Sequence, residues 1–278
     1  MACLHTPSVY TQPVSLDLVI FRKVAERIPG TTIEDRGETL AKMRSVKSRQ
    51  EVALIQHAID ITSLGFEAML RSASPGVGEH QVQEAIEHAY RSHGSRTSAF
   101  ATIVGSGVNS TVLHYTANDQ TLDDGDLVCV DSGAVFGGYA ADVTRTVPVS
   151  GTFSKRQREI YEVVLEAQAA AIEAIRPGAT FTELDDAARN VIAGAGYGDY
   201  FIHSIGHHLG LETHDATPDG PLEQGAVVTI EPGVYIPDEK IGVRIEDDVL
   251  VTESGSKVLS AKIPKRVADV EEAMKKSR

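Results

Sequence analysis

The sequence predicts an α+β fold, because helical and strand patterns alternate along most of the chain. Apolar residues recur at helical spacing after Ser48, and Ser48 with Glu51 has the pattern of a capping box. Short apolar runs with strand character, such as residues 127–130 and 227–230, lie between the helical segments. Glycine, proline and aspartate residues separate these runs. We therefore expect one mixed domain of helices and strands.

The expected elements begin with an irregular N-terminal segment. Prolines and Gly30 interrupt residues 1–43, so we expect only a short helix there, over residues 16–25, and interpret the segment as an arm or a remnant. Residues 44–278 form the main domain. Helices are expected from residue 48 and over residues 79–93, 154–175 and 181–193, the last capped by Thr180 with Glu183. Strands are expected over residues 100–104, 127–132, 139–149, 227–231 and 243–251.

Composition restricts the class of protein. The 278 residues are 42% hydrophobic and 23% charged, which is typical of a folded globular chain. We expect a cytoplasmic protein, because no run approaches the roughly 20 apolar residues of a membrane span and no basic region with an apolar run begins the chain. The two cysteines, Cys3 and Cys129, offer no disulfide framework. A net charge of -13 argues against a nucleic-acid or anionic-membrane partner.

Two aspartates flank a predicted hairpin turn. Asp131 ends one apolar run, and Asp142 lies on the returning strand after the pair Gly137-Gly138. A turn centred at these glycines places Asp131 opposite or nearly opposite Asp142, with roughly 5 Å between their Cβ atoms. Their side chains could therefore share one face of the sheet.

Two glutamates repeat this arrangement, since a turn near residues 237–240 sets Glu231 across from Glu246. A buried cluster of carboxylates either takes up protons or recruits cations, and two divalent ions would balance four carboxylates. Exposed strand acids are the usual alternative. The apolar runs before Asp131 and Glu231 are of the kind that is buried, which favours a metal centre.

A cluster of histidines supplies further candidate ligands. Four of the ten histidines lie within twelve residues: His203, His207, His208 and His214. Gly206 and Gly210 indicate a loop or strand that passes close to other backbone or to a ligand. Imidazole and carboxylate ligands suit Zn, Mn, Co or Fe, and an oxygen-rich set favours the harder Mn(II).

Four motifs, at residues 131–146, 203–215, 229–235 and 242–252, together resemble the pita-bread metallopeptidases, specifically the X-prolyl aminopeptidases and prolidases. The likeness extends over about residues 40 to 265. It implies the pita-bread, creatinase/aminopeptidase-like fold, with a curved mixed sheet covered by helices. The last motif and the histidine four residues before His207 favour the prolyl branch over the methionine aminopeptidases.

The resemblance also implies a role for each site residue. Asp131 and Asp142 would bind one divalent ion, Asp142 and Glu246 would bridge to a second, and His207 and Glu231 would complete the set. His114 and His214 would contact the substrate carbonyl or the developing oxyanion, with His203 as the third active-site histidine. We expect two ions, most readily Mn(II), with Co(II), Zn(II) and Fe(II) as alternatives.

The implied reaction is hydrolysis of the bond before a proline in the second position of a short peptide. Glu231 would be the general base, and His203 and Arg244 would meet the proline ring or a free carboxylate. Arg244 could equally be a structural partner of nearby acids.

The chain departs from the family in one respect, because only some 40 residues precede Ser48 where a domain of more than a hundred residues is usual. We therefore interpret residues 1–43 as an arm or the remnant of a lost N-terminal domain, and residues 44–278 as the catalytic domain. A homodimer is expected, although that domain helps to form it in the family. Two alternatives stay open: an enzyme acting on a non-peptide C–N or C–S bond, like ectoine hydrolase or certain lyases, and a non-enzymatic binding module.

Overall fold

The long helices begin where capping pairs stand in the sequence, as seen in the computed structural model, which describes residues 2–3 and 14–277. Capping boxes start α3 (Arg49–Ser72), α5 (Lys155–Ala174) and α6 (Phe181–Gly194). The N-cap side chain accepts the backbone N–H three residues on, and the third helical side chain accepts the N-cap N–H, which satisfies two otherwise free donors. The three helices expected in these regions are confirmed.

Four further helices and three short 3₁₀ turns complete the helical elements of the described residues. They are α1 (Leu16–Ala25), α2 (Gly37–Ser45), α4 (Glu79–Ser92), α7 (Val267–Ser277), η1 (Gly107–Thr111), η2 (Gly198–Tyr200) and η3 (Pro237–Glu239). The sequence predicts α1 and α4 but not α2 or α7. α2 begins at a glycine without a side-chain cap. α7 buries Val267, Val270 and Met274 at helical spacing, a pattern in the sequence that could have predicted this helix.

The strands of the main domain form short ladders. They are β3 (Ile103–Ser106), β4 (Leu127–Ser132), β5 (Val135–Phe136), β6 (Tyr139–Ala140), β7 (Val143–Pro148), β8 (Val227–Ile230), β9 (Gly233–Ile236), β10 (Ile241–Arg244), β11 (Asp247–Thr252) and β12 (Gly255–Val258). The strand orders are β3-β4-β7 and β12-β11-β8, with the hairpins β5-β6 and β9-β10. These ladders are antiparallel. The one described parallel pair joins β1 (Ala2–Cys3) to β2 (Glu34–Asp35).

Two expected strands are each divided in the structure. The strand expected over residues 139–149 divides at Ala141 and Asp142, and the strand expected over 243–251 divides at Ile245 and Glu246. Both breaks fall at or beside a candidate ligand, where the chain leaves one ladder and joins the next. The strand expected over 100–104 begins only at Ile103.

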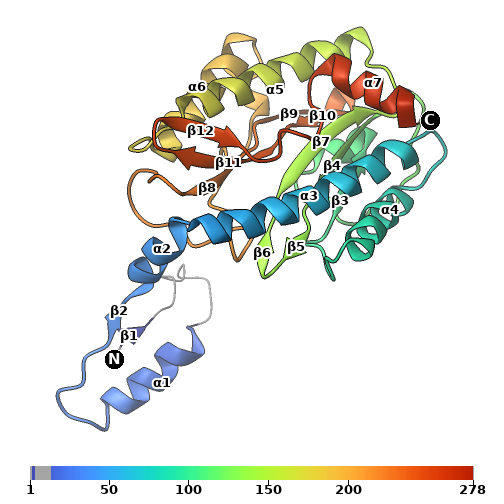
Figure 1. Cartoon of the computed structure of the whole chain (residues 1–278). Coiled ribbons are helices and arrows are strands. Elements are labelled where there is room, and N and C mark those ends of the chain that lie inside the picture. The colour runs from blue at the N-terminus through green and yellow to red at the C-terminus, as the bar shows by residue number, and fades with distance from the viewer. Residues whose placement is uncertain (1, 4–13, 278) are drawn as a thin grey trace.

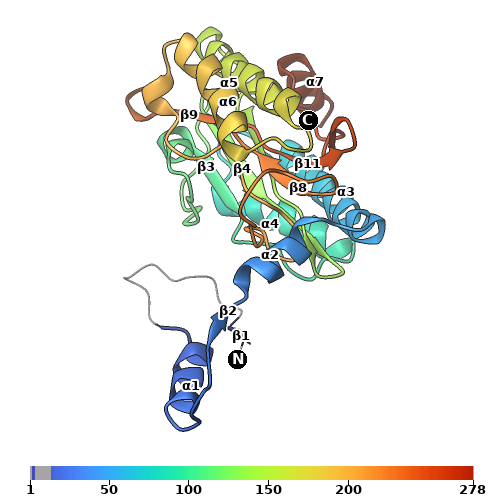
Figure 2. The same cartoon turned by 90° about the vertical axis from the view of Figure 1, so that its left-hand side faces the viewer.

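Helices cover both sides of these strands. Figure 1 shows α3 and α4 on one side and α5 and α6 on the other, and Figure 2 shows the same layers from the side. Apolar side chains fill the space between the layers; Ile160 and Val164 of α5 and Val130 of β4 are fully buried. The expected α+β fold is confirmed.

The N-terminal arm projects away from the body (Figures 1 and 2). α1 buries none of its residues, and the β1–β2 pair lies beside it. α2 leads from the arm into the body, so the boundary expected between residues 43 and 44 falls inside this helix. No helix in the described part of the chain is long and apolar enough to cross a membrane.

Candidate metal centre

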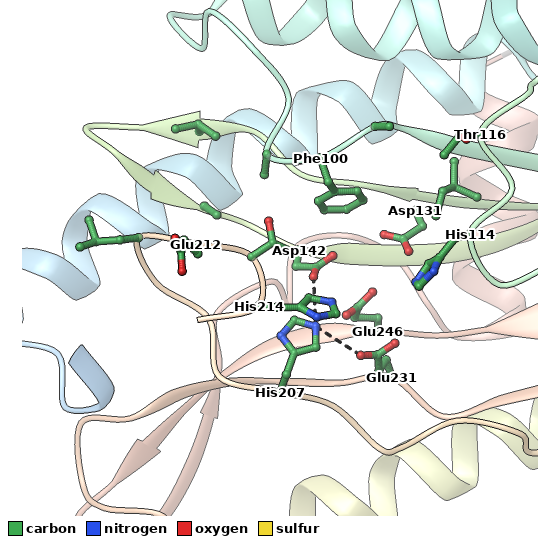
Figure 3. A pocket seen from close by; sticks show the side chains of 17 residues that line it. Phe100, His114, Thr116, Asp131, Asp142, His207, Glu212, His214, Glu231 and Glu246 are labelled. Carbon is green, nitrogen blue, oxygen red and sulfur yellow. Dashed lines mark ion pairs between the residues drawn. The ribbon is translucent and has the colours of Figure 1, made fainter. Parts of the chain in front are cut away.

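Asp131 and Asp142 reach the same face through a hairpin that leaves along β4 and returns along β7 (Figure 3). Asp131 pairs with Thr144, and Phe136 pairs with Tyr139 on either side of the glycine turn. Asp142 therefore stands two residues from the direct partner of Asp131, and residues two apart on a strand share a face. The nearly opposite arrangement expected from the sequence is confirmed, as a diagonal pair.

The two sides of this hairpin touch backbone to backbone beside the aspartates. A Cβ on Gly133 would lie 1.7 Å from the carbonyl oxygen of Ala141, so no larger residue fits without a shift. The Gly133 carbonyl accepts the Ala99 N–H at 2.8 Å, and the Ala141 N–H donates to Ala134 at 3.0 Å. This close approach sets the spacing between Asp131 and Asp142.

Glu231 and Glu246 stand directly across from each other. The pair Ile230–Asp247 on one side and the pair Gly233–Arg244 on the other fix this register. The turn runs through η3 at Pro237–Glu239, as expected. The predicted pairing of the two glutamates is confirmed.

The four carboxyl groups share a buried, mutually repulsive environment. Burial raises the pKa of Asp142 well above its usual range, and Glu246 and Asp131 raise it further. Burial likewise raises the pKa of Glu246, with Glu231 and Asp131 adding to it, although Glu246 accepts a 2.6 Å hydrogen bond from Thr144 Oγ1. Burial raises the pKa of Glu231 to about 7. Such a cluster is stabilised by protons or by cations.

His207 joins the carboxylates because its segment runs antiparallel beside β8. The Thr229 N–H donates to the His207 carbonyl at 2.9 Å, and the Glu231 N–H donates to Ile205 at 2.8 Å. A Cβ on Gly206 would lie 2.0 Å from the Thr229 carbonyl oxygen, so the expected close backbone approach is confirmed. The His207 Nε2 lies 3.5 Å from Asp142 Oδ2 and 3.4 Å from Glu231 Oε1.

The donor set fits a bound cation. His207 Nδ1 lies 3.0 Å from the carbonyl oxygen of His208, so this nitrogen carries the proton and the Nε2 lone pair faces the carboxylates. Burial lowers the pKa of His207 to about 4, which keeps the ring neutral. One ligand atom from each of Asp142, His207 and Glu246 lies within 4.8 Å of the others. Asp131 Oδ1 is buried without a hydrogen-bond partner among the described residues.

Arg244 is held within a buried network beside these acids. Its Nη2 donates to Asp131 Oδ2 at 2.7 Å, and its Nη1 donates to the Tyr235 hydroxyl at 3.1 Å. His203 Nδ1 faces the Ser204 carbonyl at 2.9 Å, so the Tyr235 O–H donates to His203 Nε2 at 2.8 Å. The contacts of Arg244 favour the structural alternative considered for it.

All the predicted site residues line one of two adjoining hollows. A cavity of about 590 Å³ is lined by the five candidate ligands together with His114 and His214, and Figure 3 shows Phe100 facing it. A smaller hollow of about 220 Å³ adds His203 and Arg244. Tyr235 was missed by the sequence reasoning, although strand alternation places residues 231, 233 and 235 on one face and could have indicated it.

The loop that carries His214 is closed by its neighbour Asp215. The Asp215 N–H donates to the His208 carbonyl at 2.9 Å, which brings the His207 and His214 rings to 4.1 Å between centroids. The buried Asp215 carboxylate pairs with Lys47 at 3.3 Å and with Arg44. These ion pairs were not predictable from sequence spacing, because they join residues far apart in the chain.

Comparison with known proteins gives consistent matches. The profile of metallopeptidase family M24 matches residues 53–253. The Xaa-Pro aminopeptidase of Haemophilus influenzae is 38% identical over 307 residues, which cover 98% of this chain and 69% of the relative. The Xaa-Pro dipeptidase of Pyrococcus furiosus is 43% identical over 228 residues, which cover 80% of this chain and 65% of the relative.

Solved structures agree with these matches. Zinc-substituted aminopeptidase P of Escherichia coli, in complex with product, superposes with a TM-score of 0.85 at 34% identity. The match covers 94% of this chain and 67% of that one. The chain thus spans about two thirds of the length of the relatives it matches.

Proposed function

Because the chain belongs to metallopeptidase family M24, we propose that it is a divalent-metal-dependent peptidase that cleaves the bond before a proline in the second position of a short peptide. The observation that carries the proposal is the convergence of four carboxylates and a neutral imidazole in one cavity. The names of the relatives, Xaa-Pro aminopeptidase and Xaa-Pro dipeptidase, supply the substrate class.

We propose two divalent ions held by Asp131, Asp142, His207, Glu231 and Glu246. The buried carboxylates, whose charges repel one another, and the lone pair of His207 support this assignment. An oxygen-rich donor set favours Mn(II), with Co(II), Zn(II) and Fe(II) as alternatives.

Each side chain then has a separate role in the hydrolytic reaction. Bound ions would polarise the scissile carbonyl and lower the pKa of the attacking water. Glu231 takes the proton of that water and passes it to the leaving proline nitrogen. His114 and His214, on the cavity wall, contact the carbonyl oxygen and stabilise the charge that develops there.

Recognition of proline rests on shape, because the proline nitrogen in the scissile bond carries no N–H to bind. His203 lines the smaller hollow with its Nε2 engaged by Tyr235, so it offers its ring as a wall. Arg244 lines the same hollow while holding Asp131. We propose that Arg244 first orients Asp131, and meets a substrate carboxylate only where one is present.

Three further assignments belong to the same proposal. We propose that residues 1–43 form an arm separate from a catalytic domain of residues 44–278, which the projecting position of α1 supports. We also propose a homodimer and a cytoplasmic location. Light scattering of the purified chain and fractionation of cells test these two.

A peptide panel tests the proposal. Metal-free protein is incubated with and without Mn²⁺, Co²⁺ or Zn²⁺, and with Ala-Pro, Ala-Pro-Ala or Met-Ala-Ser, and amino-acid release is followed. We expect metal-dependent cleavage of the prolyl peptides. Asp142→Ala should abolish it, whereas Asp186→Ala, the same change at an exposed position on α6, should not.

The pattern of cleavage also separates the alternatives. The ratio of dipeptide to tripeptide hydrolysis distinguishes a prolidase from an aminopeptidase. Release of methionine alone would replace the proposal with methionine aminopeptidase activity. Two bound metals without any cleavage would indicate a non-peptide substrate, and failure to bind metal would indicate a binding module.

A further inference from the structure

Glu79, the first residue of α4, is a fully buried carboxylate that lines neither hollow of the candidate site. Buried carboxylates are rare unless they are paired or hydrogen-bonded. Glu79 has no part in the proposed metal centre or hydrolytic steps. Its hydrogen bonds indicate what it does.

Five donors converge on this one side chain. Oε1 accepts the Ser106 N–H at 2.7 Å, the Ser106 hydroxyl at 2.7 Å and the Asn109 amide at 3.3 Å. Oε2 accepts the Tyr115 hydroxyl at 3.0 Å and the Gln120 N–H at 2.9 Å. The Glu79 N–H in turn donates to the Gln120 carbonyl at 2.8 Å. Every donor belongs to residues 106–120.

That segment carries His114 and has little regular structure of its own. After η1 ends at Thr111, residues 112–120 form neither helix nor strand, so no ladder of backbone hydrogen bonds fixes their shape. Tyr115, the immediate neighbour of His114, is bound by Glu79. The position of the His114 imidazole on the cavity wall therefore depends on side-chain contacts from elsewhere.

A second residue of α4, one turn further on, holds the same segment. The Asn118 amide donates to Gln83 Oε1 at 2.8 Å and to the Thr102 carbonyl at 2.9 Å, and its Oδ1 accepts the Val104 N–H at 3.0 Å. Asn118 is buried with a φ of 47°, a left-handed conformation that asparagine tolerates better than most residues. Gln83 thus assists Glu79 from the same face of the helix.

We propose that Glu79 is a positioning residue that fixes the His114 imidazole against the substrate cavity. This inference rests on the proposed function, in which His114 contacts the substrate carbonyl. Glu79 touches no substrate; it acts through the segment of residues 106–120. Misplacing a catalytic group by about 1 Å can cost roughly 100-fold in rate.

Glu79→Gln is the decisive variant. Glutamine keeps the size of the side chain but replaces one accepting oxygen with an NH₂ donor, so either the Ser106 half or the Tyr115 half of the network is lost. We expect kcat/KM for Ala-Pro-Ala to fall by about 10- to 100-fold. Metal content should stay that of the wild type. Glu84→Gln, the same change at an exposed position on α4, should leave kcat/KM within about twofold.

A double-mutant cycle with His114→Ala separates positioning from a general structural role. If Glu79 acts through His114, Glu79→Gln should cost less than about twofold in the His114→Ala background. An equal loss in both backgrounds, or wild-type activity of Glu79→Gln, would overturn the proposal. If Glu79→Gln does not fold, Tyr115→Phe removes the hydroxyl that contacts Glu79 and Asp119 beside His114 and is placed in the same cycle.

Hydrogen exchange gives a readout that does not need activity. Amides of residues 107–120 should exchange faster in Glu79→Gln than in the wild type, with unchanged exchange in α5. If the wild type cleaves no prolyl peptide, the proposed function fails, and exchange still decides whether Glu79 fixes this segment. Unchanged exchange in residues 107–120 would refute the role of Glu79 in either case.

Discussion

Replacing Gly133 with alanine should disturb the metal centre through the backbone rather than through a ligand. The new Cβ would lie 1.7 Å from the Ala141 carbonyl oxygen, whereas real Cβ contacts essentially never fall under 3.0 Å. The two sides of the hairpin must therefore separate by more than about 1 Å. Because Asp142 follows Ala141 directly, this movement changes its distance from Asp131.

The expected effects of Gly133→Ala follow from that displacement. Forcing an extra methyl group into a packed site costs about 1–3 kcal/mol, which lowers the melting temperature by roughly 2–12 °C in a chain of this size. Displacing a ligand by about 1 Å should lower kcat/KM for Ala-Pro-Ala by roughly 100-fold. Thermal melts followed by circular dichroism, titration calorimetry with Mn²⁺ and the peptide assay measure the three effects.

Gly255→Ala is the matched control, because Gly255 also lies in a strand but has open space where its Cβ would point. It should keep wild-type metal affinity and activity. The reasoning is refuted if Gly133→Ala retains the melting temperature, Mn²⁺ affinity and activity of the wild type, since the hairpin spacing would then not control the site.

Three other predictions concern buried charged side chains. Asp142→Asn should abolish metal binding and peptide cleavage yet raise the melting temperature of the metal-free protein, because it removes a repelled buried carboxylate; an unchanged Mn²⁺ titration would contradict this. The pKa of Glu231 rises from 4.5 to about 7 on folding, so the folded metal-free protein binds this proton more tightly than the unfolded chain does. The stabilising contribution of this proton, about 3 kcal/mol, is complete below about pH 4.5 and is lost as the pH rises through 7. Urea unfolding of the metal-free protein at pH 5 and pH 8 measures the loss. The metal-saturated protein should not show this loss. Arg145→Ala should destabilise the chain by about 3–5 kcal/mol in urea unfolding, because it removes one of the two cationic partners of buried Asp247 and the donor to four backbone carbonyls.

The sequence predicted the parts of the site that depend on local turns. The glycine pair at residues 137–138 and the turn near residues 237–240 set the two hairpins, and strand periodicity then brings each acidic pair together. The offset of Asp142 by two residues follows from the same turn, because a register centred between Gly137 and Gly138 pairs Asp131 with Thr144. The long helices were predictable for a similar reason, since their caps lie within four residues of sequence.

Contacts between distant segments could not be predicted from the sequence. The contacts that favour a structural role for Arg244, with Asp131 and Tyr235, could not be predicted from the sequence. The hydrogen bonds of Glu79 likewise join the start of α4 to residues up to 41 positions away. Sequence spacing carries little information on such pairs, because tertiary packing rather than local geometry brings them together.

The ion pairs of Asp215 set how far the chain can be shortened from its N-terminus. Arg44 and Lys47 come from the end of α2 and the residues just after it, and both meet the carboxylate that follows His214. A chain beginning at residue 44 would keep both counter-ions. One beginning at residue 48 would leave a buried, unpaired carboxylate beside His214, a change that costs about 3–5 kcal/mol. Residues 44–47 therefore support the loop that carries His214, although they lie beside the arm.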